Sequence, residues 1–185
     1  EATGTGVAIV LREHARHHAE DIEGKTVAIQ GFGNVGIHTA KAFQSHGMKV
    51  IAVSDSRGGI FDESGLDIDG LRSHIDVGAR VSAYEGAKAI TNDHLLKLPC
   101  DYLVPAALGG VIDENMAGKI RARVVVEAAN SPTTFAGDKV LADRGIAVLP
   151  DILANAGGVI VSYFEWVQNM QQMPWKKERI GRAHV

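Results

Sequence analysis

The apolar residues of this chain occur in short continuous runs rather than in strict alternation with polar residues. Such runs are typical of strands in a parallel sheet that is covered on both faces, because both sides of each strand are then buried. On this basis we predict five strands, over residues 27–30, 50–54, 102–104, 124–126 and 146–149.

The segments between these runs carry apolar residues at helical spacing. They predict helices over residues 7–18, 35–46, 66–75, 91–98, 113–120, 135–144 and 158–172, and a glycine-punctuated loop over 57–65. Gly47 is a typical C-cap of the second helix, and Thr91 is a typical N-cap of the fourth. The alternation of strand and helix predicts a doubly wound α/β fold, with a mostly parallel sheet and helices on both faces.

A glycine-rich motif follows the first predicted strand and opens the second predicted helix. Its sequence is Gly31-Phe32-Gly33-Asn34-Val35-Gly36. The first glycine permits a tight turn, the second lets the backbone approach a pyrophosphate, and the third allows close packing of helix on strand. The free N–H groups at the helix start attract an anion. The context predicts a Rossmann-like dinucleotide-binding domain, and a glycine-rich turn without a ligand is the alternative interpretation.

The second predicted strand leads into Asp55, 19 residues after Gly36. A carboxylate at this place accepts hydrogen bonds from the adenosine ribose and repels a 2′-phosphate, which favours NAD. Ser56 and Arg57 follow at once, and an arginine can pair with the extra phosphate of NADP. The sequence therefore favours NAD only slightly and leaves NADP open.

The composition excludes some classes of function. A net charge of −3 argues against binding to a nucleic-acid backbone, which requires a basic surface. We also find no apolar stretch near the ~20 residues that a membrane helix needs. The single cysteine, Cys100, cannot form an internal disulfide, which favours the cytoplasm. It stands at the start of an apolar run, so we interpret it as a buried structural thiol rather than a nucleophile.

Three histidines, His14, His17 and His18, fall on one face of the first predicted helix. This spacing can hold a metal ion, but no carboxylate or cysteine joins them at matching spacing. We therefore favour a solvated helix face and assign no metal ligand.

Several blocks outside the glycine motif resemble the glutamate dehydrogenase family, which also includes leucine, phenylalanine and valine dehydrogenases. In chain order they are Glu1-Ala2-Thr3-Gly4-Thr5-Gly6-Val7, Ala52-Val53-Ser54-Asp55-Ser56, Leu103-Val104-Pro105-Ala106-Ala107-Leu108, Glu127-Ala128-Ala129-Asn130 and Pro150-Asp151-Ile152-Leu153-Ala154-Asn155-Ala156-Gly157-Gly158-Val159. The last block continues as Val161-Ser162-Tyr163-Phe164-Glu165-Trp166, which is typical of the glutamate enzymes. The resemblance covers residues 1–172.

This resemblance implies reversible deamination of L-glutamate to 2-oxoglutarate and ammonium, with hydride transfer to NAD or NADP. It assigns cofactor contacts near the nicotinamide to Thr3, Ala106, Asn130 and Asn155, and a further cofactor contact to Ala107. It assigns substrate contacts to Val159 and Ser162, the serine hydroxyl meeting the distal carboxylate. Such a donor selects a substrate with a second carboxylate. Departures from the family pattern include Ser131, where glycine is usual, and Phe135, where proline is common.

The resemblance also predicts the domain organisation. We expect residues 1–160 to form the NAD(P)-binding domain, and residues 161–185 to begin a helical segment that returns to a substrate domain outside this sequence. The family's catalytic lysine and aspartate lie in that upstream domain, so we assign no acid–base residue here and expect this fragment to bind cofactor without turnover.

The parent protein is expected to be a homo-oligomer, hexameric by resemblance. Two rival hypotheses remain: a dehydrogenase of an apolar amino acid, and a standalone NAD(P)-sensing module without turnover.

Overall fold

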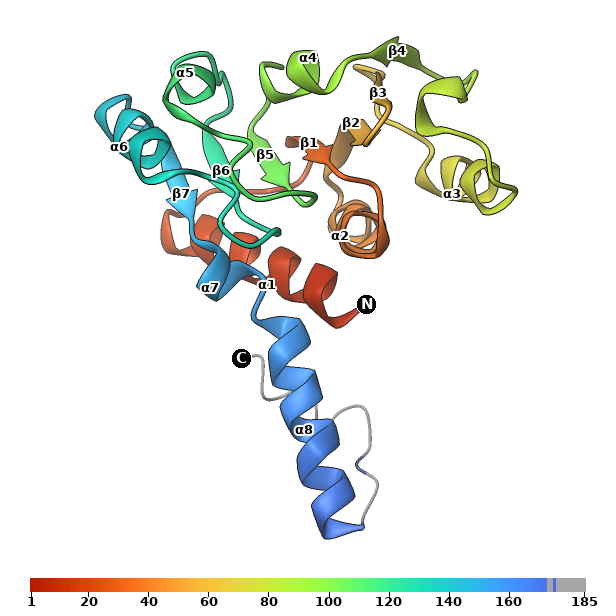
Figure 1. The fold of residues 1–185 in the computed structure, drawn as a ribbon, viewed down its shortest axis with the longest axis vertical. Coiled ribbons are helices and arrows are strands. Elements are labelled where there is room, and N and C mark those ends of the chain that lie inside the picture. Colours follow the sequence, from red (N-terminus) through yellow and green to blue (C-terminus); the bar gives the residue numbers. More distant parts are fainter. Residues whose placement is uncertain (173–174, 176–185) are drawn as a thin grey trace.

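A computed structural model of the chain describes residues 1–172 and 175 (Figure 1). Its strands form one sheet in the order β4-β3-β2-β1-β5-β6-β7. Their bounds are β1 Thr26–Gln30, β2 Lys49–Asp55, β3 Gly58–Phe61, β4 Lys88–Ile90, β5 Tyr102–Pro105, β6 Val124–Val126 and β7 Ala147–Leu149.

The sheet is mostly parallel, as the apolar runs predicted. Strands β1, β2, β5, β6 and β7 pair in parallel, whereas β3 runs antiparallel to both β2 and β4. The loop expected over 57–65 is therefore wrong in part. A tight turn after Asp55 brings the chain back, and Ile60 pairs with Val53 across the two strands. The apolar pattern did not predict this strand, because it is short and begins with two adjacent glycines.

Helices cover both faces of the sheet, which confirms the doubly wound arrangement. They are α1 Ala2–His17, α2 Asn34–Ser45, α3 Ile68–Asp76, α4 Asn92–Leu96, α5 Glu114–Ala117, α6 Phe135–Asp143, α7 Asp151–Ala154 and α8 Gly157–Gln171, with a 3-10 turn at Val81–Ala83. Figure 1 shows α1 and α2 on one side of the sheet and α4 and α5 on the other. The core is divided accordingly: Val27 and Ile29 of β1 belong to one apolar cluster, and Ala28 between them belongs to the other.

Helix α1 begins at Ala2, not at residue 7 as predicted. Glycine is a poor helix former, and the first turns of α1 contain Gly4 and Gly6. Tertiary packing overrides this preference, because a Cβ on Gly4 would lie 2.6 Å from the backbone nitrogen of Thr39 in α2. The glycine thus lets α1 approach α2 closely.

The ends of several helices are fixed by side-chain caps. The hydroxyl of Thr91 accepts a hydrogen bond from the His94 N–H at 3.0 Å, which confirms the predicted cap of α4. Asp113 caps α5 in the same way through the Met116 N–H at 2.7 Å. Helix α5 ends at Ala117 and is shorter than the 113–120 predicted.

The described helices and the histidine face of α1 show neither a membrane span nor a metal site. Within residues 1–172 and 175, no helix is long and apolar enough to cross a membrane. The rings of His14 and His18 lie with their centroids 4.3 Å apart and are tilted by 41°, and the described residues contain no group of three or more side chains arranged to hold a metal ion.

Candidate functional site

The site begins where the winding of the sheet reverses. From β1 the chain proceeds through β2, β3 and β4 on one side, and β5, β6 and β7 follow on the other. In open α/β sheets, ligands bind outside the carboxyl ends of the strands at such a switch point. Here the two strands end side by side, and the Ala106 N–H after β5 donates to the Gln30 carbonyl of β1 at 2.7 Å.

The turn after β1 has no room for side chains at two of its glycines. Gly31 has a φ of +101°, and a Cβ on it would also lie 2.8 Å from the Cβ of Ala107. A Cβ on Gly36 would lie only 1.8 Å from the Gly31 carbonyl oxygen. These two glycines therefore set the shape of the turn and the close contact between α2 and β1.

The start of α2 can receive an anion. Its N-cap, Gly33, has no side chain to occupy the first free N–H groups of the helix. A Cβ on Gly33 would meet no atom within 4 Å, so the space in front of this turn is open. Gly33 and Asn34 are exposed, and the helix dipole adds positive potential at this point. The turn fits the pyrophosphate of a dinucleotide.

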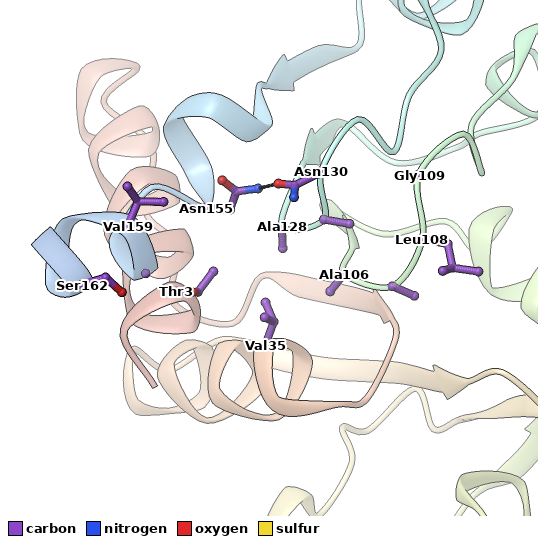
Figure 2. Close-up of a pocket in the computed structure, with 13 residues that line it drawn as sticks. Thr3, Val35, Ala106, Leu108, Gly109, Ala128, Asn130, Asn155, Val159 and Ser162 are labelled. Atoms are coloured by element: carbon purple, nitrogen blue, oxygen red, sulfur yellow. Dashed lines mark hydrogen bonds between the residues drawn. The ribbon is translucent and has the colours of Figure 1, made fainter.

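A cavity of about 620 Å³ adjoins this turn (Figure 2). It lies between the starts of α1 and α2, the segments after β5 and β6, and the helices α7 and α8. Its walls are formed by Thr3, Val35, Ala106, Ala107, Leu108, Gly109, Ala128, Ala129, Asn130, Asn155, Gly158, Val159 and Ser162. None of these lining residues carries an ionisable side chain. The cavity suits a neutral or apolar ring with hydrogen-bonding substituents, and it offers no group for proton transfer.

An amide pair forms one wall of the cavity. The Asn155 side-chain nitrogen donates to the Asn130 side-chain oxygen at 2.8 Å, and Figure 2 shows this bond beside the space that Thr3 and Val35 also face. The two residues are 25 positions apart in the sequence and come from different connections at the same edge of the sheet.

Asp55 lies at the end of β2, outside the cavity lining. Its carboxylate accepts hydrogen bonds from the backbone N–H groups of Arg57 at 2.7 Å and Val81 at 3.3 Å. The Asn92 side chain donates to the Asp55 carbonyl at 2.8 Å. Asp55 is thus half-buried and held in place by its own turn and the 3-10 turn, and Ser56 next to it is exposed.

Comparison with known proteins decides the family. The sequence model of the glutamate/leucine/phenylalanine/valine dehydrogenase family matches residues 1–183. The chain belongs to this family. The chain is 51% identical over 183 residues to one relative, glutamate dehydrogenase A2 of Halobacterium salinarum. It is 50% identical over 179 residues to the cryptic catabolic NAD-specific glutamate dehydrogenase GudB of Bacillus subtilis.

Solved dehydrogenase structures have the same fold. The chain matches the hetero-hexameric glutamate dehydrogenase of Thermus thermophilus in its Leu-bound form with a TM-score of 0.92 and 31% identity, covering 99% of this chain and 43% of that one. The glutamate dehydrogenase of Peptoniphilus asaccharolyticus gives a TM-score of 0.80 and 39% identity over 99% and 42% of the two chains. The match to the Halobacterium relative covers 98% of this chain but only 44% of the relative. The match to the Bacillus relative covers 97% of this chain and 42% of the relative. This chain therefore spans less than half the length of these relatives.

The structure gathers most of the residues singled out from the glycine motif and the dehydrogenase resemblance. Those that line the cavity are Thr3, Val35, Ala106, Ala107, Asn130, Asn155, Val159 and Ser162. The other motif residues, Gly31, Phe32, Gly33, Asn34 and Gly36, form the adjoining turn. Phe32 is 5% exposed and packs in the core, so only its backbone can face a ligand.

Five lining residues were not singled out from the sequence: Leu108, Gly109, Ala128, Ala129 and Gly158. All but Gly109 stand inside family blocks already quoted, and Gly109 follows directly after one. Their position in or next to these family blocks is therefore the sequence feature that could have identified them.

Proposed function

We propose that this chain is the cofactor-binding part of an NAD(P)-dependent dehydrogenase that reversibly deaminates L-glutamate to 2-oxoglutarate and ammonium. The observation that carries the proposal is the junction of an anion-binding turn with a neutral cavity lined by residues of α1, α2 and α8 and of the segments after β5, β6 and α7. The family membership and the names of the two relatives support the reaction type.

The residues present fit a nicotinamide dinucleotide. The first N–H groups of α2 would hold the pyrophosphate, since Gly33 leaves the approach open. Thr3, Asn130 and Asn155 would hold the nicotinamide end, and Asp55 the adenosine ribose. When bound, the nicotinamide supplies the hydride acceptor or donor. Val35 and Ala106 in the cavity wall would pack against the ring and reduce its contact with water.

Substrate selection is proposed to rest on α8. Val159 and Ser162 lie one turn apart on this helix and both line the cavity near Thr3. Ser162 is exposed, and its hydroxyl has no hydrogen bond within residues 1–172 and 175. A free hydroxyl can donate to the distal carboxylate of glutamate, and an apolar substrate would leave it unpaired.

We propose residues 1–160 as the NAD(P)-binding domain and 161–185 as the start of a helical segment leading to a substrate domain. The proton-transfer groups are assigned to that domain, because none of the cavity-lining residues is ionisable. The parent protein is proposed to be a cytoplasmic homo-oligomer, with six subunits the expected number. Analytical ultracentrifugation of the full-length protein tests the subunit number.

For the cofactor we favour NAD slightly over NADP. The Asp55 carboxylate is held in place by two backbone N–H groups, and its negative charge repels a 2′-phosphate. Arg57 is exposed and adjacent, which supports some use of NADP. The relative from Bacillus subtilis is named as NAD-specific.

The test uses the full-length protein. Replacing Ser162 by alanine should lower the preference for glutamate over norvaline in kcat/KM by about tenfold or more, since a hydrogen bond to a charged group is lost. Asn169→Ala, at an exposed position further along the same helix, is the matched control and should leave the preference unchanged. An unchanged preference in Ser162→Ala removes this serine from the substrate site. Cofactor binding without any turnover would support the sensing module instead.

A further inference from the structure

Asp151, the first residue of α7, joins two connections at the edge of the cavity. One carboxylate oxygen accepts the Ser131 N–H at 2.7 Å, and the other accepts the Ile152 N–H at 2.7 Å. The Asp151 N–H in turn donates to the carboxylate of Glu127 at 3.0 Å. Glu127 is 6% exposed and follows β6 directly. The start of α7 is therefore tied to the β6–α6 connection at two points.

The connection that Asp151 holds has a strained backbone. Ser131 has a φ of +45°, a conformation that costs a residue with a Cβ on the order of 1–2 kcal/mol. Its N–H is held by Asp151, and its carbonyl accepts the Gly110 N–H at 2.9 Å. A charged acceptor makes a hydrogen bond about twice as strong as a neutral one. The bond from Asp151 therefore helps keep Ser131 in this conformation.

Each of the two joined segments carries an asparagine of the cavity wall. Asn130 directly precedes the strained Ser131, and Asn155 directly follows the last residue of α7. Because Asn155 donates to Asn130, the amide hydrogens of Asn130 and the side-chain oxygen of Asn155 are left for a ligand. The pair offers one donor and one acceptor, which complement the carbonyl and NH2 of a primary carboxamide.

We infer that Asp151 is a positioning residue for the carboxamide of the nicotinamide. Asp151 does not line the cavity, so it acts through the segments that carry Asn130 and Asn155. By fastening the start of α7 to the backbone beside Asn130, it sets the spacing and orientation of the two amides. The inference rests on the proposed function, since it requires a nicotinamide in this cavity.

The experiment compares three ligands on the full-length protein by calorimetric titration. NADH carries the carboxamide, the acetylpyridine analogue of NADH replaces its NH2 by a methyl group, and ADP-ribose lacks the ring altogether. Asp151→Ala should weaken NADH binding about tenfold and leave ADP-ribose within about twofold. Its effect on the acetylpyridine analogue should be smaller than on NADH, because that ligand has only one of the two contacts to lose.

Asp113→Ala is the matched control. Asp113 also accepts a backbone N–H at the start of a four-residue helix, but it does not line the cavity or bond to a segment that carries either asparagine. It should not distinguish NADH from ADP-ribose. If Asp151→Ala does not fold, Asp151→Asn replaces it, with an expected loss of about threefold for NADH alone.

The outcomes separate two kinds of failure. Equal weakening of NADH and ADP-ribose by the Asp151 variant, or no weakening of either, overturns the positioning role. An equal effect on NADH and its acetylpyridine analogue overturns the pairing of the carboxamide with the two amides. A wild-type protein that binds none of the three ligands overturns the proposed function itself.

Discussion

The two glycines at the start of α2 should respond to the same substitution in different ways. Alanine at Gly36 places a Cβ 1.8 Å from the Gly31 carbonyl oxygen and 2.9 Å from its carbonyl carbon. Both are backbone atoms, and an ordinary contact of about 3.4 Å requires α2 and β1 to move apart by roughly 1.6 Å. Overpacking of this kind costs about 3 kcal/mol of unfolding free energy. The shift also moves the N–H groups of the turn, so dinucleotide affinity should fall.

Alanine at Gly33 is the matched comparison. Its φ of −87° suits any residue, and its Cβ would meet nothing within 4 Å. The unfolding free energy should therefore change by less than about 1 kcal/mol, the usual difference between glycine and alanine at an N-cap. The same Cβ projects into the open space assigned to the pyrophosphate, so NADH affinity should fall by about a hundredfold.

Urea unfolding and NADH titration of both variants test this reasoning. We expect Gly36→Ala to lose stability and affinity together, and Gly33→Ala to lose affinity alone. Wild-type stability in Gly36→Ala would refute the packing argument. Wild-type affinity in Gly33→Ala would refute the placement of the pyrophosphate.

Three further predictions concern stability and reactivity. Ser131→Gly should stabilise the fold by about 0.5–1 kcal/mol in urea unfolding, because glycine adopts a positive φ without strain; a loss would show that the serine conformation is not costly. Burial raises the pKa of Asp101, but hydrogen bonds from the Thr26 N–H and hydroxyl and the nearby Lys25 outweigh it, so the pKa lies below its ordinary value. This contribution is present above about pH 4 and is lost as the pH falls through the lowered pKa, so the stability gap between wild type and Asp101→Asn should shrink in acid; a constant gap would contradict it. Burial raises the pKa of Cys100 to about 12, so a thiol reagent at pH ~8 should label it only after unfolding; rapid labelling of the native protein would contradict the buried thiol.

The parallel part of the sheet and the turn after β1 could be predicted from the residues alone. Continuous apolar runs identify strands that are covered on both faces, and the glycine motif stands between such a run and a helix. The strands β3 and β4 could not be found in this way. Gly58 and Gly59 are typical of a loop, and they belong to a strand because they pair with Asp55 and Ser54 of β2.

The cavity could be predicted only through the family resemblance. Within the glycine motif, Val35 alone reaches its lining. Thr3, Asn130 and Ser162 are far apart in the sequence, and no local pattern indicates that they meet. The early start of α1 and the short helix α7 were missed for a related reason. The early start of α1 is stabilised by its close contact with α2. Helix α7 is stabilised by the hydrogen bonds that Asp151 makes with Glu127 and Ser131.

The described sheet ends on both sides in very short strands. β4 and β7 have three residues each, and Lys88 of β4 is exposed. An outer strand of this length offers few backbone groups to a strand from another molecule, and a lysine there opposes the desolvation that such pairing requires. Edge-to-edge aggregation is therefore disfavoured at both margins, and concentrated solutions of the folded domain should not form β-rich assemblies through them.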